Sequence, residues 1–153
     1  MNKKNIENKI NNFLQKENFK NIPFNYQRSI IIRAYEVNED VDWSFNDKIN
    51  WENDIEKIKV LIKDYSNTYP NRLFEFGIVP MNLIIERVMV SPEFSIYNTF
   101  DEYHKTYGDT GVNHNEIFPI LCSDSEEDYI EDGWHRFHFY YDIGLNKIPI
   151  IKI

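Results

Sequence analysis

The residues best suited to chemistry in this sequence lie together between Glu131 and Arg136. A tight turn at Asp132-Gly133 is expected to lead directly into the first turn of a helix. Backbone N–H groups at a helix start have no intrahelical partner, and the helix dipole adds partial positive charge there. Gly133 lets a ligand approach the main chain, while His135 and Arg136 supply side-chain donors, and arginine's planar fork suits phosphate oxygens. The pattern therefore predicts an anion site.

Two carboxylates adjoin these donors. Glu131 and Asp132 are each placed to hold a metal ion or to orient His135. The simpler interpretation is that Asp132 only caps the helix while Arg136 pairs with a nearby acid, because strand–turn–helix junctions are common.

Glu131–Arg136 followed by Gly144–Ile150 resembles the ParB/sulfiredoxin superfamily. Its members carry a Gly-x-His-Arg or Asp-Gly-x-x-Arg turn, a helix, and then Gly-Leu-x-x-Ile-Pro-Val. In that superfamily the turn holds the phosphates of a nucleotide. The resemblance implies this role for Gly133, His135 and Arg136.

The resemblance covers about residues 83–153. It implies an α+β fold, with a small mixed β-sheet and packed helices, preceded here by a mainly helical N-terminal segment. Members of the superfamily include DNA-binding CTPases, an ATP-dependent reductase of oxidised cysteine, free-serine kinases and nuclease-like proteins. Trp134 stands where the reductase has its catalytic cysteine, and the only cysteine is Cys122. We therefore expect no sulfiredoxin reaction.

The closest local match is the Asp-Gly-His-His-Arg turn of the small-molecule kinases, with tryptophan replacing the first histidine. Kinase-type members keep an acidic base near the position of Glu93, where a carboxylate takes the proton from an attacking hydroxyl. An exposed loop acid after a proline is the simpler interpretation of Glu93. The resemblance thus implies Glu93, Glu131 and Asp132 as candidates for acid–base or metal chemistry.

We expect a nucleotide-binding protein, namely a phosphotransferase or NTPase that uses ATP or CTP with Mg²⁺ and acts on a small-molecule acceptor. One alternative is a non-catalytic interaction module of a plasmid or phage, with a protein partner. Another is a DNA-binding or nuclease-like protein. A basic groove leading to Arg136 would favour nucleic acid, and a closed pocket would favour a small substrate.

Composition limits these alternatives. The 153 residues are 42% hydrophobic and 16% aromatic, which suffices for a packed core. No apolar run approaches the ~18–20 residues that cross a membrane, and the start lacks the apolar region of a secretory signal, so we expect a cytoplasmic protein. Residues 84–153 hold 5 basic and 13 acidic side chains, which accounts for the whole net charge of −8. Duplex DNA binding is disfavoured, because it needs clustered Lys and Arg.

A metal site made of protein ligands alone is not expected. His135 and His138 stand at i, i+3, and His104, His114 and Cys122 add further candidate ligands. The spacings match no zinc signature, however. Cys122 lies in an apolar stretch and is expected to be buried and inert.

The elements that position the motif follow from periodicity. A strand at Tyr129–Glu131 is expected to lead into a helix from Trp134 to Ile143, with Trp134, Phe137 and Tyr141 on its buried face and Gly144 ending it. Pro149 is tolerable only at the start of the next strand, Lys147–Ile153, or on an edge. Elsewhere the pattern predicts three helices: Asn5–Glu17, Trp51–Tyr65 with Asn50 as its cap, and a helix that Asn98 or Thr99 caps and that ends at about Tyr107. It also predicts strands over Ser29–Val37, Leu83–Val90 and Ile117–Cys122. For Ser29–Val37 a helix is nearly as well favoured.

Turn-forming residues between Ser66 and Arg72 indicate a boundary between an N-terminal segment, 1–72, and the ParB/sulfiredoxin-like domain, 73–153. Gly77–Pro80 is a second candidate boundary. The two parts also differ in charge, since residues 1–83 are balanced at 12 basic and 12 acidic side chains.

Overall fold

The chain divides into two compact units in the computed structural model, which describes residues 2–36, 53–108, 117–123 and 129–153. The first unit comprises Met1–Gln15 and Glu75–Ile153, and the second comprises Lys16–Phe74. The chain leaves the first unit within strand β1 (Leu14–Asn18) and returns to it within strand β2 (Leu73–Pro80). The sequence predicted one division at residue 72. The structure instead groups the first fifteen residues with the C-terminal part.

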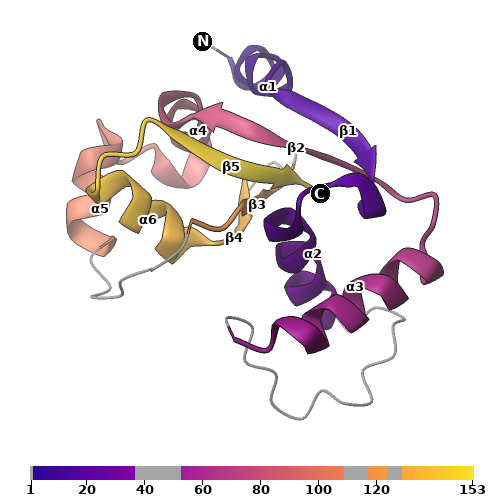
Figure 1. Ribbon diagram of the computed structural model, residues 1–153. Coiled ribbons are helices and arrows are strands. Elements are labelled where there is room, and N and C mark those ends of the chain that lie inside the picture. Colours follow the sequence, from indigo (N-terminus) through magenta and orange to yellow (C-terminus); the bar gives the residue numbers. More distant parts are fainter. Residues whose placement is uncertain (1, 37–52, 109–116, 124–128) are drawn as a thin grey trace. The chain divides into compact units, whose positions relative to one another are not determined.

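The fold is α+β, as predicted (Figure 1). Besides parts of β1 and β2, the first unit contains α1 (Lys3–Asn11), α4 (Met81–Met89), a 3₁₀ turn η2 (Pro92–Phe94), α5 (Phe100–Tyr107), β3 (Ile120–Cys122), β4 (Ile130–Asp132), α6 (Trp134–Asp142) and β5 (Lys147–Lys152). The second unit contains a 3₁₀ turn η1 (Phe19–Asn21), α2 (Phe24–Glu36) and α3 (Ile55–Thr68).

The strands form one mixed sheet in the order β1-β2-β5-β3-β4. β5 is antiparallel to β2 and parallel to β3, and β3 is antiparallel to β4. β5 is therefore an interior strand with Pro149 as its third residue, whereas the sequence predicted that Pro149 lies at the start of the strand or on an edge. Pro149 is tolerated because the parallel ladder with β3 begins one residue later, at Ile150. A residue that lacks an N–H removes no bond from a ladder that has not yet started.

Helix α6 and its flanking turns agree with the sequence prediction. Gly144 adopts φ 76°, its N–H donates to the Tyr141 carbonyl, and the Leu145 N–H donates to the Tyr140 carbonyl, both at 3.1 Å. This is the hydrogen-bond pattern of a Schellman C-cap, which favours glycine. Along the helix, Phe137 and Tyr140 are fully buried, whereas the predicted face residues Trp134 and Tyr141 are half-buried.

Two predicted strands are helical. Leu83–Val90 belongs to α4, where Met81, Ile84 and Val88 recur at i, i+3, i+7 on the buried face. Ser29–Val37 falls largely in α2, which buries Tyr26, Ile30 and Ala34 at i, i+4, i+8. A short stretch rich in β-branched and other apolar residues does not distinguish the two structures by itself, and here the 3.6-residue period decides.

Two predicted helices have different bounds. The stretch Asn5–Glu17 is split: α1 ends at Asn11, and β1 begins at Leu14. α3 begins at Ile55 and continues to Thr68, into the stretch predicted as a turn, while Asn50 lies outside the described residues. Thr99 caps α5 as expected, because its hydroxyl accepts the Glu102 N–H at 3.2 Å. The second candidate boundary, at Gly77–Pro80, lies inside β2.

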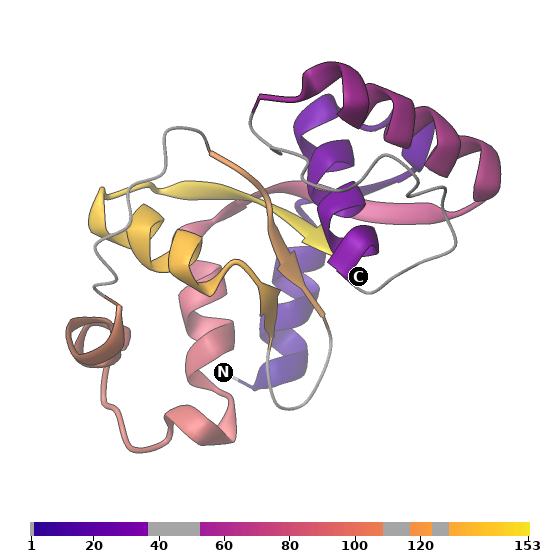
Figure 2. The same ribbon diagram turned by 90° about the horizontal axis from the view of Figure 1, so that it is seen from below.

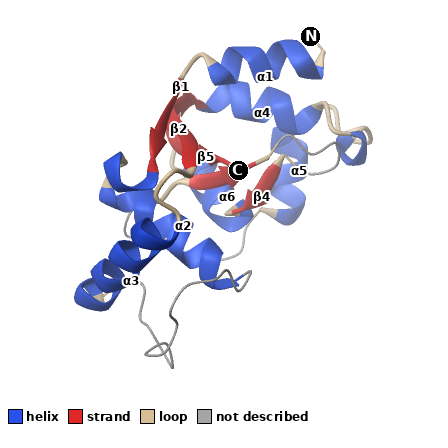
Figure 3. Cartoon of the chain, turned by 90° about the vertical axis from the view of Figure 1, so that its right-hand side faces the viewer, coloured by secondary structure: helices blue, strands red, loops and turns tan. Residues whose placement is uncertain are grey.

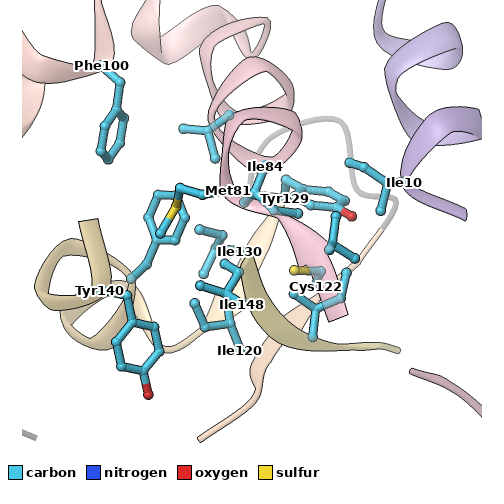
Figure 4. Close-up of a cluster of buried hydrophobic side chains, with 14 of the residues drawn as sticks. Ile10, Met81, Ile84, Phe100, Ile120, Cys122, Tyr129, Ile130, Tyr140 and Ile148 are labelled. Atoms are coloured by element: carbon cyan, nitrogen blue, oxygen red, sulfur yellow. The ribbon is translucent and has the colours of Figure 1, made fainter. Parts of the chain in front are cut away.

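The core of the first unit lies between the sheet and helices α1, α4 and α6. Figure 4 shows side chains from these elements meeting, among them Ile10, Ile84 and Ile148. α1 lies beside α4 (Figures 2 and 3). Arg87 of α4 is fully buried, and its Nε donates to a Glu7 carboxylate oxygen at 2.8 Å. This ion pair links α1 to α4.

The second unit is stabilised largely by aromatic packing. The Phe19 and Tyr65 rings lie 4.6 Å apart, and the Arg72 guanidinium lies 3.7 Å from the centre of the Tyr69 ring. Arg72 also donates to the Tyr65 hydroxyl at 2.8 Å. Across the described part of the chain, no helix combines the length and the apolar character needed to cross a membrane.

Candidate functional site: the turn at Gly133

Gly133 is the N-cap of α6 and lies between β4 and the helix. Its φ of 102° falls in the left-handed region, which favours glycine. The Phe137 N–H donates to the Gly133 carbonyl at 2.8 Å, so the first helical bond closes on the glycine itself. The amides of residues 134–136 therefore precede the first residue with an intrahelical acceptor, at the positive end of the helix dipole.

Arg136 folds back over this glycine. A Cβ added at Gly133 would lie 2.9 Å from the Arg136 Nη2 atom and 3.2 Å from its Nε. The same Nη2 lies 3.9 Å from an Asp132 carboxylate oxygen, with Arg136 17% and Asp132 37% exposed. At this distance and exposure the ion pair contributes less than about 1 kcal/mol. Gly133 is the residue that leaves room for the Arg136 guanidinium over the turn.

The other candidate residues of the turn are more exposed. His135 is exposed, and Glu131 is exposed while it accepts a hydrogen bond from the Ser123 hydroxyl at 3.2 Å. Successive residues on a helix point about 100° apart. His135 and Arg136 therefore extend from the helix start in different directions.

Glu93 lies in a segment that the fold brings to the same end of α6. It occupies the 3₁₀ turn Pro92–Phe94, and the Phe94 ring lies 5.9 Å from the ring of Trp134, the first residue of the helix. The Glu93 side chain is exposed. Its segment and the turn at Gly133 are therefore neighbours, although they are forty residues apart in sequence.

Trp134 belongs to an aromatic cluster that joins η2, α5 and α6. Its ring lies 5.9 Å from Phe94, 6.3 Å from Tyr103 and 5.9 Å from His138. Trp134 is half-buried, as expected for a residue that packs on one side and borders the turn on the other.

The candidate metal ligands do not gather into one site. His104 and His138 meet, with their Nδ1 atoms 2.9 Å apart, but His135 is exposed and Cys122 is buried in β3. His114 lies outside the described residues. Within the described ranges, no group of three or more His, Cys, Asp or Glu residues is arranged to hold a metal ion.

Cys122 is fully buried, as predicted. Burial raises the pKa of its thiol well above the ordinary value, against smaller opposing contributions from the Tyr129 hydrogen bond and from the charges of Arg87 and Lys152. The thiol is therefore protonated at neutral pH, which disfavours a role as nucleophile.

A cavity of about 390 Å³ lies at the opposite end of α6 from Gly133. It is lined by residues of α4, of the end of α6 and of the Gly144–Asn146 turn, namely Met81, Asn82, Ile85, Tyr141, Gly144, Leu145 and Asn146. The sequence did not predict this cavity, because its two walls come from segments some sixty residues apart.

No family model matches the chain, and no curated protein or solved structure is significantly similar to it.

Proposed function

We propose that the turn at Gly133 binds the phosphates of a nucleotide, in a ParB/sulfiredoxin-like protein that acts as a phosphotransferase or NTPase on a small molecule. The observation that carries the proposal is the position of the Arg136 guanidinium. The guanidinium lies directly over Gly133, a left-handed glycine at the start of α6, and its Nη2 atom is only 2.9 Å from the point where a Cβ would lie on that glycine. Backbone amides and an arginine fork on one side of a glycine suit a phosphate group.

The residues of the turn fit such a group. Gly133 leaves room for the Arg136 side chain over the turn, since the Cβ of any larger residue would lie 2.9 Å from Arg136 Nη2. In this proposal Arg136 binds the phosphate oxygens, and the preceding residue, His135, donates a second hydrogen bond to the same phosphate group. The nucleotide, ATP or CTP with Mg²⁺, supplies the transferable phosphoryl group.

The carboxylates around the turn have separate proposed roles. Asp132 and Glu131 lie where they would repel phosphate unless a cation intervenes, so we assign them to a Mg²⁺ ion that arrives with the nucleotide. Glu93, on the neighbouring η2, is the candidate base for an acceptor hydroxyl.

Arg136→Ala tests the proposal. The Asp132–Arg136 pair is long and partly exposed, so the melting temperature of the unliganded protein should change little. Loss of the charge-assisted hydrogen bonds should cost about 1.5–3 kcal/mol of binding free energy, roughly ten- to a hundredfold in affinity. A thermal-shift screen with ATP, ADP, CTP and GTP, with and without Mg²⁺, measures both quantities.

A matched control is Lys105→Ala, which removes an exposed cation of α5 and should leave the nucleotide shift intact. An Arg136→Ala protein with an unchanged shift and a destabilised fold would make Arg136 a structural ion-pair partner and would refute the nucleotide site.

A non-catalytic interaction module is the second candidate. Two observations favour it: Arg136 already has an acidic neighbour in Asp132, and the cavity near α6 lies at the other end of the helix. A DNA-binding or nuclease-like function is the third, and the acidic balance of residues 84–153 opposes it. Absence of any nucleotide shift in the wild-type protein would favour the module. Duplex binding with a steep salt dependence in a fluorescence-polarisation assay would favour DNA.

A further inference from the structure

Two buried histidines face each other between α5 and α6. His104 on α5 is 6% exposed and His138 on α6 is 3% exposed. The two ring centres lie 5.1 Å apart and the two Nδ1 atoms only 2.9 Å apart, so each Nδ1 points from its ring toward the other. The rings are tilted by only 23°. This is the geometry of an N–H···N hydrogen bond between two imidazoles.

A metal ion does not explain this contact. A zinc–imidazole bond is about 2.0–2.1 Å long, so an ion on the line between the nitrogens would need a much wider separation than 2.9 Å. A hydrogen bond needs one Nδ1 with a proton and one without. The contact therefore exists only while at least one of the two imidazoles is neutral.

The remaining nitrogen of His104 is also engaged. Its Nε2 lies 2.6 Å from a carboxylate oxygen of Asp142, which is 56% exposed and lies at the C-terminal end of α6. A neutral His104 donates from Nε2 to Asp142 and accepts at Nδ1 from His138. A charged His104 donates from both nitrogens, and His138 then accepts. In either state the chain Asp142–His104–His138 remains connected.

The end of α5 is built tightly around this bond. Gly108 follows α5, and its N–H donates to the His104 carbonyl at 2.7 Å. A Cβ added at Gly108 would overlap the Nδ1 atoms of both histidines. The backbone that leaves α5 thus lies directly against the histidine pair, so the position of this backbone depends on whether the pair is closed.

We propose that the His104–His138 pair is an acid-sensitive latch, which holds α5 on α6 while one imidazole is neutral and releases α5 when both are charged. Two charged rings present an N–H to an N–H, so the bond is lost and the charges repel at the shortest contact between the helices. Release of α5 would also uncover Trp134, because Tyr103 and Phe100 of α5 cover the aromatic cluster beside the turn at Gly133.

The surroundings of the pair support a step in acid. Burial, with smaller contributions from the charges of His104 and His135, lowers the pKa of His138 to about 4, against the opposing charge of Asp142. Because this value lies below the ordinary 6.5, the closed state binds fewer protons than the open state. The free energy by which the closed pair holds α5 on α6 is therefore complete above about pH 6.5 and decreases as the pH falls toward 4.

Other titratable groups around the pair come from both helices. On α5, the Asp101 carboxylate pairs with Lys105 at 2.9 Å and accepts from the Tyr141 hydroxyl at 3.0 Å. These hydrogen bonds hold the pKa of Asp101 below its usual range, so this link between the helices persists in acid and does not cause the release. The groups near the pair are Asp101, Tyr103, Lys105, His135, Tyr141 and Asp142.

Amide hydrogen exchange of the full chain tests the latch. After correction for intrinsic exchange rates, protection of α5 should fall by about tenfold per pH unit as the pH drops from 6 toward 4, because one extra proton drives the opening. Protection of β5 should stay constant over the same range. Constant protection of α5, or a simultaneous loss in α5 and β5, would overturn the proposal.

Variants separate the pair from its neighbours. His138→Phe keeps an aromatic ring in the cluster but cannot be charged, and α5 should then lose its pH dependence. His135→Gln removes an exposed imidazole whose charge lowers the pKa of His138, so the variant should shift the response toward higher pH without abolishing it. If His138→Phe responds to acid as the wild type does, the latch is refuted.

A measurement on the wild-type protein keeps the test valid if a variant fails to fold. In uniformly ¹⁵N-labelled protein, a through-hydrogen-bond coupling should connect the Nδ1 nuclei of His104 and His138 at pH 7 and should vanish at the pH at which α5 loses protection. Absence of this coupling at pH 7 would show that the pair is not bonded and would overturn the proposal.

Discussion

Replacement of Gly133 by alanine should damage the fold and the proposed phosphate site together. At φ 102° an L-residue costs about 1–2 kcal/mol relative to glycine. The new Cβ would also lie 2.9 Å from Nη2 and 3.2 Å from Nε of Arg136. Non-bonded heavy atoms prefer separations of about 3.5–4.0 Å, so the guanidinium must move away from the turn.

The chain offers a matched control in Gly144. It also has a positive φ, 76°, but no atom lies within 4 Å of a Cβ added there. Gly144→Ala should therefore show the conformational cost alone. For a protein of this size, each kcal/mol lowers the melting temperature by about 2–4 °C, so both variants should melt about 2–8 °C below the wild type.

The assay is a thermal melt of the three proteins with and without Mg²⁺ and ATP. We expect Gly144→Ala to keep the nucleotide-induced shift and Gly133→Ala to lose it, because only the second change displaces Arg136. Equal shifts in the two variants would refute the reasoning, since Arg136 would then not need its position above Gly133.

Three further outcomes are expected. Glu7→Gln leaves Arg87 buried without its carboxylate and should lower the free energy of unfolding, measured in urea, by about 3–5 kcal/mol. Its control is Glu86→Gln, an exposed change on α4, which should change that free energy by less than about 0.5 kcal/mol. Equal effects of the two changes would contradict the role of the Glu7–Arg87 pair. Trp134→Ala should cost about 2–3 kcal/mol, less than full burial would imply, and a cost near zero would place the ring outside the core. Cys122 should react with a thiol reagent only after unfolding, and fast labelling of the native protein would contradict its burial.

The part of the fold that sequence reasoning predicted best is the part with local signals. Gly133 and Gly144 mark the two ends of α6, and both adopt positive φ. The cap of α5 was placed at Asn98 or Thr99, and Thr99 is the residue whose side chain accepts a first-turn N–H. Such features depend on a few consecutive residues, so one sequence suffices to locate them.

The errors occurred where the decisive partner is distant in sequence. Leu83–Val90 is an exception, because its helical period is local: Met81, Ile84 and Val88 lie on one buried face. The pairing of Arg87 with Glu7 joins residues eighty positions apart and assigns α1 to the first unit. No local pattern predicts that pairing.

The candidate site shows the same division. The order of residues in the turn was evident, but the position of Arg136 over Gly133 depends on rotamers that a sequence does not specify. His104 and His138 were noted as possible ligands without any indication that they meet. Their contact depends on how α5 packs on α6, which is set by the aromatic residues between the helices.

The place of β5 in the sheet constrains the order of assembly. β5 is the last strand along the chain, yet it lies between β2 and β3, and the Ile153 N–H still donates to the Cys122 carbonyl at 2.8 Å. A nascent chain shorter than about residue 152 therefore lacks the strand that joins the two halves of the sheet. β2 and β3 emerge from the ribosome well before they have a common neighbour. Their inner edges stay unpaired until the chain is synthesised through β5, and during synthesis these exposed edges are the most natural binding site for a chaperone.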